Sequence, residues 1–392
     1  MSSVAAQSTH SIAGRLFAMV GAHGGGVGLP PASVAGWSEA DWVRLLHLAT
    51  YNGVTSYVYE DLVVNPCDGA DAVRLHLRER SYRCGYRGLG LRAELIRLVR
   101  AFEAEGIAVM PLKGPLLADR FYRNKSLREF GDLDLLVKEV DRDRAWQLLQ
   151  RLDYHSPYQN HDLERRYHVV FAHRSTGEIV ELHWRIAGPQ FGVYFRGDFL
   201  WKDARPVAYA GIQVLQPSVE ANLLYLAIHA YKHDWSRLQW LLDFPEILAS
   251  PAEIDWDALD RLAREQHAHR LLRATFQLVK HFFPHAPGVP AGHALGVPAL
   301  GPAQIRRVVR CLLRPATDAE RLGDFYRLRV ALAETAGDRL RLIRESLQPS
   351  DRDDDFLRLP AALRPFAFLM RPIRLAGRML LGRSREAERR HS

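Results

Sequence analysis

The segment 131–137 constrains the fold of this chain more than any other, because its residues read GDLDLLV. Side chains two residues apart in a β-strand lie on the same face. A strand over 133–137 therefore places the carboxylates of Asp132 and Asp134 side by side. Neighbouring carboxylates repel each other unless they share a proton or a cation, and hard divalent ions such as Mg²⁺ are common partners of oxygen clusters. The pair is a candidate metal site.

The composition is that of an ordinary globular protein with two or three domains: 392 residues, of which 47% are hydrophobic and 25% charged. An apolar stretch at 12–20 contains Arg15 and makes a poor signal peptide. No uncharged apolar run reaches the roughly eighteen residues of a membrane-spanning helix. The three cysteines have no C-x-x-C spacing, which is typical of reduced thiols. We expect a cytoplasmic protein without a transmembrane segment.

The net charge of +8 is concentrated near the C-terminal end. Residues 361–392 contain eight Arg and two Glu, so they carry six of the eight net positive charges. This basic tail is predicted to contact an acidic partner or an anionic membrane surface. The rest of the chain is nearly neutral and has no interleaved basic and aromatic stripe, which argues against a nucleic-acid partner.

Hydrophobic periodicity predicts helices first, then an α/β unit, then more helices. Ser38 and Asp41 have the spacing of a capping box, and apolar residues recur on one helical face over 89–104. In the α/β unit we expect strands at 107–112, 133–137, 167–173 and 178–186, helices at 116–122 and 142–152, and a hairpin turn at Gly177. Later helical patterns cover 221–248, 256–263 and 271–283.

These changes of pattern divide the chain into five parts. They are an N-terminal helical segment (1–86), an α/β domain (87–217), a helical domain (218–283), a linker rich in Pro and Gly (284–303), and C-terminal helices with the basic tail (304–392). The helical domain is expected to close a cleft over the α/β domain.

Residues suited to phosphate binding follow the expected strand at 107–112. Gly114 permits close approach of the backbone, and the helix that begins there offers free N–H groups. Lys113 adds a positive charge. Pro115 suits the first helical turn, because its missing N–H would have no partner there.

Two further groups strengthen the candidate site. Arg128 precedes the acidic strand and is expected either to clamp its carboxylates or to hold a phosphate. Glu181 and His183 alternate with apolar residues, so they share a face, and Glu181 supplies a third carboxylate. His183 either acts directly at the site or packs at the sheet edge.

The order of these motifs resembles that of nucleotidyltransferases in the DNA polymerase beta superfamily. The match is closer to a bacterial branch of nucleotidyltransferase family proteins that is largely uncharacterised and often linked to biosynthetic gene clusters. The resemblance spans about residues 40–280. The motifs that carry it are LKG at 112–114, Tyr122 with Arg128, GDLDLLV at 131–137, ELHW at 181–184, IHAYKHDW at 228–235 and LLD at 241–243.

The resemblance implies an α+β fold, in which a mixed sheet is flanked by helices, with N-terminal helices and a helical C-terminal domain. It implies Mg²⁺-dependent transfer of a nucleoside monophosphate from an NTP such as ATP to a hydroxyl or phosphate of a small molecule, peptide or protein, with release of pyrophosphate. Two Mg²⁺ ions, or Mn²⁺ in their place, would be held by Asp132, Asp134 and Glu181, which are the implied catalytic residues. The nucleotide would contact Lys113, Gly114, Arg128 and Lys232.

Pro115 is a departure, since many members of the wider superfamily have Ser or Thr directly after the Gly to hold a terminal phosphate. Two alternatives therefore stay open. One is a phosphotransferase that moves only the γ-phosphate, and the other is a non-catalytic nucleotide-binding or scaffold protein.

His229 and His233 form a second cluster, because they are four residues apart on a predicted helix and Asp243 follows one helical stretch later. This spacing is compatible with a bound metal ion, with a buried polar network, or with a lining of the nucleotide cleft. The sequence does not choose among these three roles.

Overall fold

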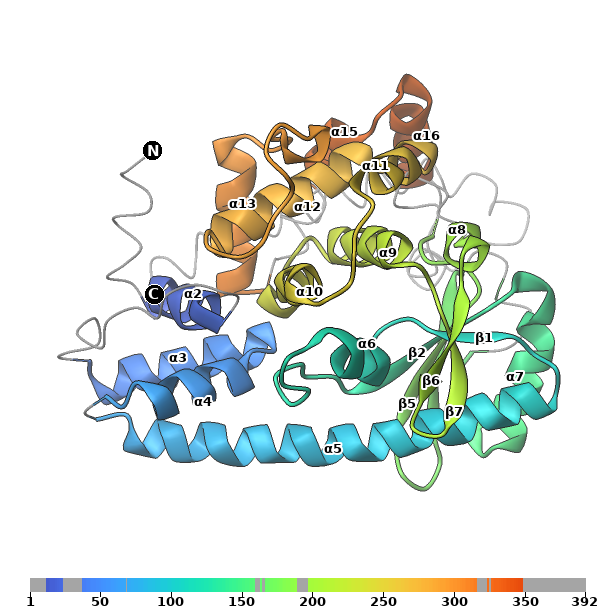
Figure 1. Cartoon of the computed structure of the whole chain (residues 1–392), viewed down its shortest axis with the longest axis horizontal. Coiled ribbons are helices and arrows are strands. Elements are labelled where there is room, and N and C mark those ends of the chain that lie inside the picture. The colour runs from blue at the N-terminus through green and yellow to red at the C-terminus, as the bar shows by residue number, and fades with distance from the viewer. Residues whose placement is uncertain are drawn as a thin grey trace, which may run out of the picture.

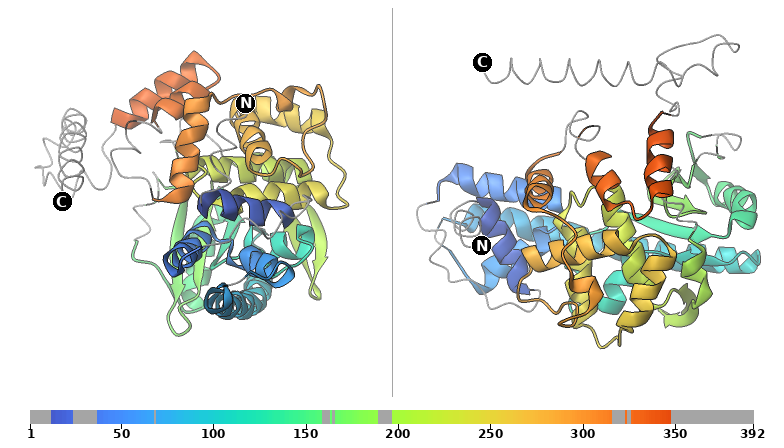
Figure 2. Two further views of the ribbon diagram at one scale, coloured as in Figure 1. Left: turned by 90° about the vertical axis from the view of Figure 1, so that its left-hand side faces the viewer. Right: turned by 90° about the horizontal axis from the view of Figure 1, so that it is seen from above.

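The structure is a computed structural model, and it describes residues 12–23, 37–67, 69–158, 163, 166–188, 197–315, 323 and 326–347. The basic tail at 361–392 lies outside the described residues. The N-terminal helices lie at one end of the molecule and a mixed sheet at the other (Figure 1). The long helix α5 (Asp71–Ala104) runs along one side, opposite a layer formed by the later helices (Figures 1 and 2).

The main sheet has five strands in the order β1-β2-β5-β4-β3. Their bounds are β1 (Val109–Pro111), β2 (Asp132–Val137), β3 (Tyr154–His155), β4 (His168–His173) and β5 (Ile179–His183). Strands β2 and β5 are parallel and the other neighbours are antiparallel. The expected α+β class, with a mixed sheet flanked by helices, is confirmed. The short strand β3 was not predicted.

One face of the sheet is apolar and packs against two helices, α5 and α7 (Arg142–Arg151). The buried cluster on this face contains Leu133 and Leu135 of β2, Val180 and Leu182 of β5, Leu91, Leu95 and Leu98 of α5, and Trp146 and Leu149 of α7. Side chains alternate along a strand, so the residues between these point to the opposite face. The acidic residues of β2 and β5 therefore face away from α5.

Helix α5 is longer than the sequence indicated. It contains 34 residues and begins at Asp71, whereas apolar periodicity predicted a start at residue 89. The N-terminal half has few buried residues, so it carries little apolar periodicity. The expected domain boundary between residues 86 and 87 falls inside this helix, and the division into five parts stays a prediction.

A second, two-stranded sheet follows the main sheet, and the sequence analysis missed it. It consists of β6 (Arg205–Tyr209) and β7 (Ile212–Gln216), joined by a turn in which Ala210 and Gly211 both have positive φ. The helix α8 (Asp198–Lys202) precedes it. The available signal is weak: Gly211 lies between two short runs that contain β-branched or aromatic residues.

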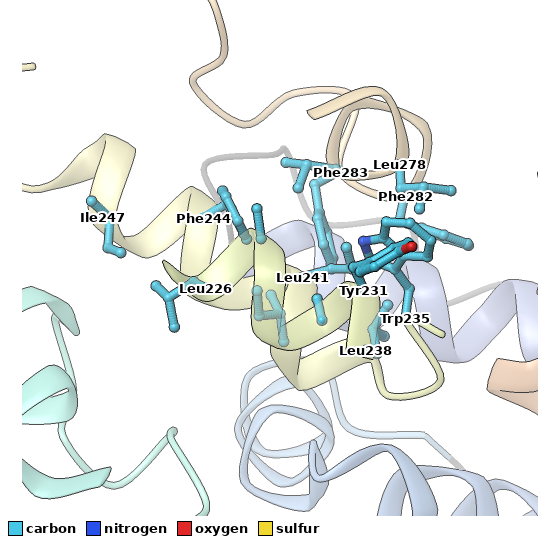
Figure 3. Close-up of a cluster of buried hydrophobic side chains, with 14 of the residues drawn as sticks. Leu226, Tyr231, Trp235, Leu238, Leu241, Phe244, Ile247, Leu278, Phe282 and Phe283 are labelled. Carbon is cyan, nitrogen blue, oxygen red and sulfur yellow. The ribbon is translucent and has the colours of Figure 1, made fainter. Parts of the chain in front are cut away.

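The layer of later helices supplies most of a second buried cluster, which also contains residues of the N-terminal helices; Figure 3 shows part of it. The layer contains α9 (Val219–Lys232), α10 (Leu238–Ala249), α11 (Trp256–Glu265) and α12 (His269–Phe282). The helix predicted over 221–248 is two helices, because the chain turns at Asp234 and Trp235, which have φ of 58° and 48°. The turn buries Trp235, whose indole N–H donates to Thr275 of α12.

The remaining elements cover the ends of this cluster. At the N-terminal side they are α2 (Ile12–His23), α3 (Glu39–Asn52) and α4 (Thr55–Val64), and later in the chain α13 (Pro302–Leu313), α15 (Tyr326–Leu332) and α16 (Ala336–Leu347). The predicted capping box of Ser38 and Asp41 begins α3. Over 284–301 the chain is irregular apart from the short turn η5 (Ala294–Gly296), and the last two residues of the expected linker, 302–303, belong to α13. Within the described part of the chain, no helix has the length and apolar character needed to cross a membrane.

Candidate active site

The three predicted carboxylates lie together, on the face of the sheet that points away from α5. In the parallel pairing of β2 and β5, Asp134 is the direct partner of Glu181, and Asp132 is the partner of Ile179. All three acids line one cavity of about 490 Å³. The register therefore brings together residues that are 47 positions apart in sequence, as Asp134 and Glu181 are.

Two cationic side chains contact these carboxylates. Nζ of Lys113 lies 3.0 Å from Oδ1 of Asp134, and Nε2 of His183 lies 3.2 Å from the same oxygen and 3.3 Å from Oε2 of Glu181. Among the described residues, Asp134, Glu181 and His183 form a group whose ligand atoms are close enough to hold a metal ion. Asp132 is the adjacent acid of the same cavity and is half-buried, while Asp134 is buried.

The electrostatics show how closely these groups interact. Burial and the neighbouring carboxylates of Asp134 and Glu181 raise the pKa of Asp132 to about 6. Burial acts in the same direction on Asp134, but Lys113 and His183 outweigh it and hold the pKa of Asp134 below its ordinary value. The two carboxylates raise the pKa of His183 despite its burial. Lys113 and His183 thus offset part of the negative charge of the cluster.

The turn at Lys113 and Gly114 is built by the β1–β2 pairing. The backbone N–H of Leu112 donates to the carbonyl of Asp134, so the next residue, Lys113, lies beside the acidic cluster. Gly114 begins α6 (Gly114–Phe121) with a φ of 60°, a conformation that favours glycine. Pro115 occupies the first turn of α6, as the sequence predicted.

Helix α9 supplies the opposite wall of the cavity. Lys232 is buried, donates to the carbonyl of Ile186, and lies 4.4 Å from the centre of the Tyr167 ring. Burial, together with the positive charge of Lys113, lowers the pKa of Lys232 to about 7. A buried ammonium group with such a pKa is readily stabilised in its charged form by an anionic ligand.

His229 and His233 belong to an aromatic cluster at the same wall. Their ring centres are 4.8 Å apart and lie 5.3 and 4.9 Å from the centre of the half-buried Trp240. Burial and the nearby Lys113, whose Nζ is 3.4 Å from each ring nitrogen of His229, lower the pKa of His229 well below its ordinary value. Both histidines line the cavity that contains the three carboxylates, and the choice among the three predicted roles stays a prediction.

Arg128 and Asp243 lie at the site in a way that the sequence did not predict. Arg128 was expected to clamp the acidic strand or to hold a phosphate. Instead, its guanidinium makes two hydrogen bonds to Asp243, at 2.8 and 3.0 Å, and Tyr122 donates to the same carboxylate. All three side chains are buried. The direct hydrogen bonds of Arg128 thus go to Asp243 of α10 rather than to the acidic strand, and they join the helical layer to the α/β part. Arg128 still lines the cavity of the three carboxylates, and its contact with a phosphate stays a prediction.

Comparison with known proteins decides the family. A model of the family described as uncharacterised nucleotidyltransferase matches residues 38–284. The chain belongs to this nucleotidyltransferase family. No curated protein matches the chain significantly.

A solved structure of the antibiotic-resistance factor ANT(2'')-Ia is similar to this nucleotidyltransferase with 14% sequence identity. The match covers 46% of this chain and 94% of that one, with a TM-score of 0.35. A likeness of this degree supports no conclusion about the activity of the present protein.

The cavity of this nucleotidyltransferase also contains residues that the sequence analysis did not select, namely His168, Tyr167 and Trp240. His168 is the partner of His183 in the β4–β5 pairing, and the two rings stack with centres 4.9 Å apart. His168 also lies 3.8 Å from the carboxylate of Glu181. His168 lies in a predicted strand, but a strand prediction does not show which strand pairs with it, so the sequence could not place His168 beside His183.

Proposed function

We propose that this protein transfers a nucleoside monophosphate from an NTP to an acceptor, with divalent metal ions, and releases pyrophosphate. The observation that carries the proposal is the register of β2 and β5, which sets Asp134 directly beside Glu181, with Asp132 on the same face. Lys113 and Lys232 line the same cavity. Family membership supports the class of reaction.

The residues present fit a divalent metal site. Three carboxylates face one cavity, and oxygen donors are what Mg²⁺ prefers in proteins. The imidazole of His183, within 3.3 Å of two of these carboxylates, also suits Mn²⁺. Asp132, Asp134 and Glu181 would hold two ions, which when bound neutralise the triphosphate and acidify the acceptor hydroxyl.

The side chains of the protein would then position the nucleotide and handle the proton. Lys113 and Lys232 would contact phosphate oxygens from opposite walls, and the backbone N–H groups after Gly114 would add hydrogen bonds. A bond would form from the acceptor oxygen to the α-phosphorus as the bond to pyrophosphate breaks. Glu181 would accept the proton of the attacking hydroxyl.

The proposed acceptor is a hydroxyl or phosphate of a small molecule, peptide or protein. Two alternatives to a nucleotidyltransferase are tested with it. A phosphotransferase would release a nucleoside diphosphate rather than pyrophosphate. A non-catalytic nucleotide-binding or scaffold protein would bind NTP without turnover, and Pro115 makes this alternative relevant.

The test is incubation with each α-labelled NTP, Mg²⁺ and a host extract, followed by identification of labelled products. We expect label in an acceptor together with released pyrophosphate, and no transfer by the double variant Asp132→Asn/Asp134→Asn. Full transfer by that variant would show that the assigned site is wrong. Release of nucleoside diphosphate would support the phosphotransferase, and NTP binding by calorimetry without any turnover would support the non-catalytic protein.

A further inference from the structure

A second cavity, of about 780 Å³, adjoins the candidate active site. It lies between α4, the middle of α5 and the connection from α6 to β2, and we call it the α5 groove. Helix α5 lies alongside both α4 and α6 (Figure 1). Arg128 and Phe130 line the α5 groove and the active-site cavity alike, and Phe130 is two residues before Asp132. A molecule in the α5 groove would therefore have one end next to the acidic cluster.

Two glycines of α5 form part of the floor of the α5 groove. Gly85 and Gly88 are three residues apart on α5, so they lie on one helical face. A Cβ on Gly88 would lie 3.0 Å from Nη1 of Arg92 and 3.4 Å from the ring of Phe130, whereas a Cβ on Gly85 would meet nothing within 4 Å. Tyr82 and Tyr86 border this floor, with 67% and 82% of their surfaces exposed. Exposed aromatic side chains grouped around a groove are typical of a binding site.

Each charged side chain in the lining of the α5 groove has an oppositely charged neighbour. Arg92 makes a two-pronged ion pair with Asp119 at 2.7 Å, and Lys125 lies 3.7 Å from the same carboxylate. Of the other ionised groups in the lining, Glu60 pairs with Arg123 and Arg128 pairs with Asp243. Because each of these charged groups already has a partner, the lining favours an uncharged ligand.

We propose that the α5 groove binds the acceptor, and that the acceptor is a neutral hydroxyl compound with an aromatic ring. This inference rests on the proposed function, and it names the substrate class for that site. The ring packs on the glycine floor against Tyr82, Tyr86 and Phe130, through dispersion and stacking. The hydroxyl end then lies toward Asp132, where the nucleotide is bound.

The experiment compares Gly85→Leu with a matched control, Gly90→Leu. Both replace a glycine of α5 by a good helix former, and a Cβ on Gly90 has only an ordinary contact, 3.8 Å from Glu178. Gly90 does not line the α5 groove. The probes are a panel of neutral aromatic glycosides and a panel of sugar phosphates, whose binding to the full chain is measured by calorimetry. NTP binding with Mg²⁺ is measured for the same variants.

We expect saturable binding of aromatic glycosides by the natural protein, weakened about tenfold or more by Gly85→Leu and less than about twofold by Gly90→Leu. NTP affinity should be unchanged in both variants. The inference fails if no glycoside binds, if sugar phosphates bind as well as glycosides do, or if the two variants behave alike. It also fails if the protein is a dimer that Tyr86→Ala converts to a monomer, since a second copy would then cover the groove. Normal NTP binding and transfer in those cases would leave the proposed function intact.

Discussion

Asp134 and Glu181 are direct partners in the parallel pairing of β2 and β5, and Nε2 of His183 lies 3.2 and 3.3 Å from their carboxylates. Two acids and an imidazole thus converge from strands that are distant in sequence. Such a cluster is electrostatically costly without cations, and five predictions test what the cluster and the residues around it do.

Glu181→Gln should abolish metal binding at one position of the site. The amide keeps the shape of the side chain but loses its charge, so we expect transfer to fall about a hundredfold or more. Mn²⁺ affinity, measured by calorimetry, should fall with it. Glu178→Gln is the matched control, because Glu178 lies near the hairpin turn and accepts a hydrogen bond from Thr176 rather than joining the cavity. Equal losses of transfer in the two variants would show that Glu181 is not part of the site.

Lys232 should make nucleotide binding depend on pH. Its pKa of about 7 means that the ammonium form prevails below pH 7 and is lost above it. NTP affinity should therefore decrease between pH 7 and 9, measured by calorimetry. The Lys232→Arg variant should keep its charge over this range, so its NTP affinity should depend little on pH. The Lys232→Met variant should bind NTP weakly at every pH. An identical pH profile in all three proteins would contradict a phosphate contact by Lys232.

Lys232 should make the stability of the nucleotide-free protein rise with pH, whereas it makes NTP affinity fall. The pKa of Lys232 is lower in the folded protein than its ordinary value of 10.5, so between these two values the unfolded chain binds more protons. The free energy of unfolding of the nucleotide-free protein should then rise with pH over this window. Urea unfolding at pH 7 and 9 should show a larger rise for the natural protein than for Lys232→Met.

Arg128→Met should destabilise the fold strongly. It leaves the buried carboxylate of Asp243 without its cationic partner, which we expect to cost about 3–5 kcal/mol in the free energy of unfolding measured with urea. In a double-mutant cycle, Asp243→Asn should lower the free energy of unfolding much less in the Arg128→Met variant than in the natural protein. Arg83→Ala, which breaks the exposed pair of Arg83 and Glu79, should have little effect. Additive effects of the two buried substitutions would mean that the pair does not act as a unit.

Gly114→Ala should impair both stability and nucleotide binding. A side chain at a φ of 60° is strained by about 1–2 kcal/mol, and relief of that strain would move the adjacent Lys113. Gly177→Ala is the control, since Gly177 has a φ of 71° in a hairpin turn and a Cβ there meets nothing within 4 Å. Both variants should lose similar stability, but NTP affinity should decrease only for Gly114→Ala. Unchanged affinity in both would show that the turn does not position the nucleotide.

Local patterns in the sequence predicted much of the α/β part, because they depend on neighbours along the chain. The capping box at Ser38 lies at the start of α3, as predicted, and the segment 131–137 with alternating side chains contains β2. The failures have physical causes. The start of α5 carries few buried residues and so little periodicity. The turn at Asp234 and Trp235 lies inside an apolar run, where the break is favoured by distant contacts, namely the burial of Trp235 against α12 and the ion pair of Asp234 with Arg329.

The sequence by itself determined that Asp132 and Asp134 share one face of a strand, because side-chain alternation is a property of the backbone. It likewise determined that Gly114 can make the turn into α6. Only the tertiary structure decided which groups meet them. The parallel register set Glu181 opposite Asp134, where a shift by one residue would have turned it to the other face. Packing of α9 and α10 brought Lys232 to the cavity and gave Arg128 its partner Asp243, since contacts between distant segments depend on how the whole core is packed.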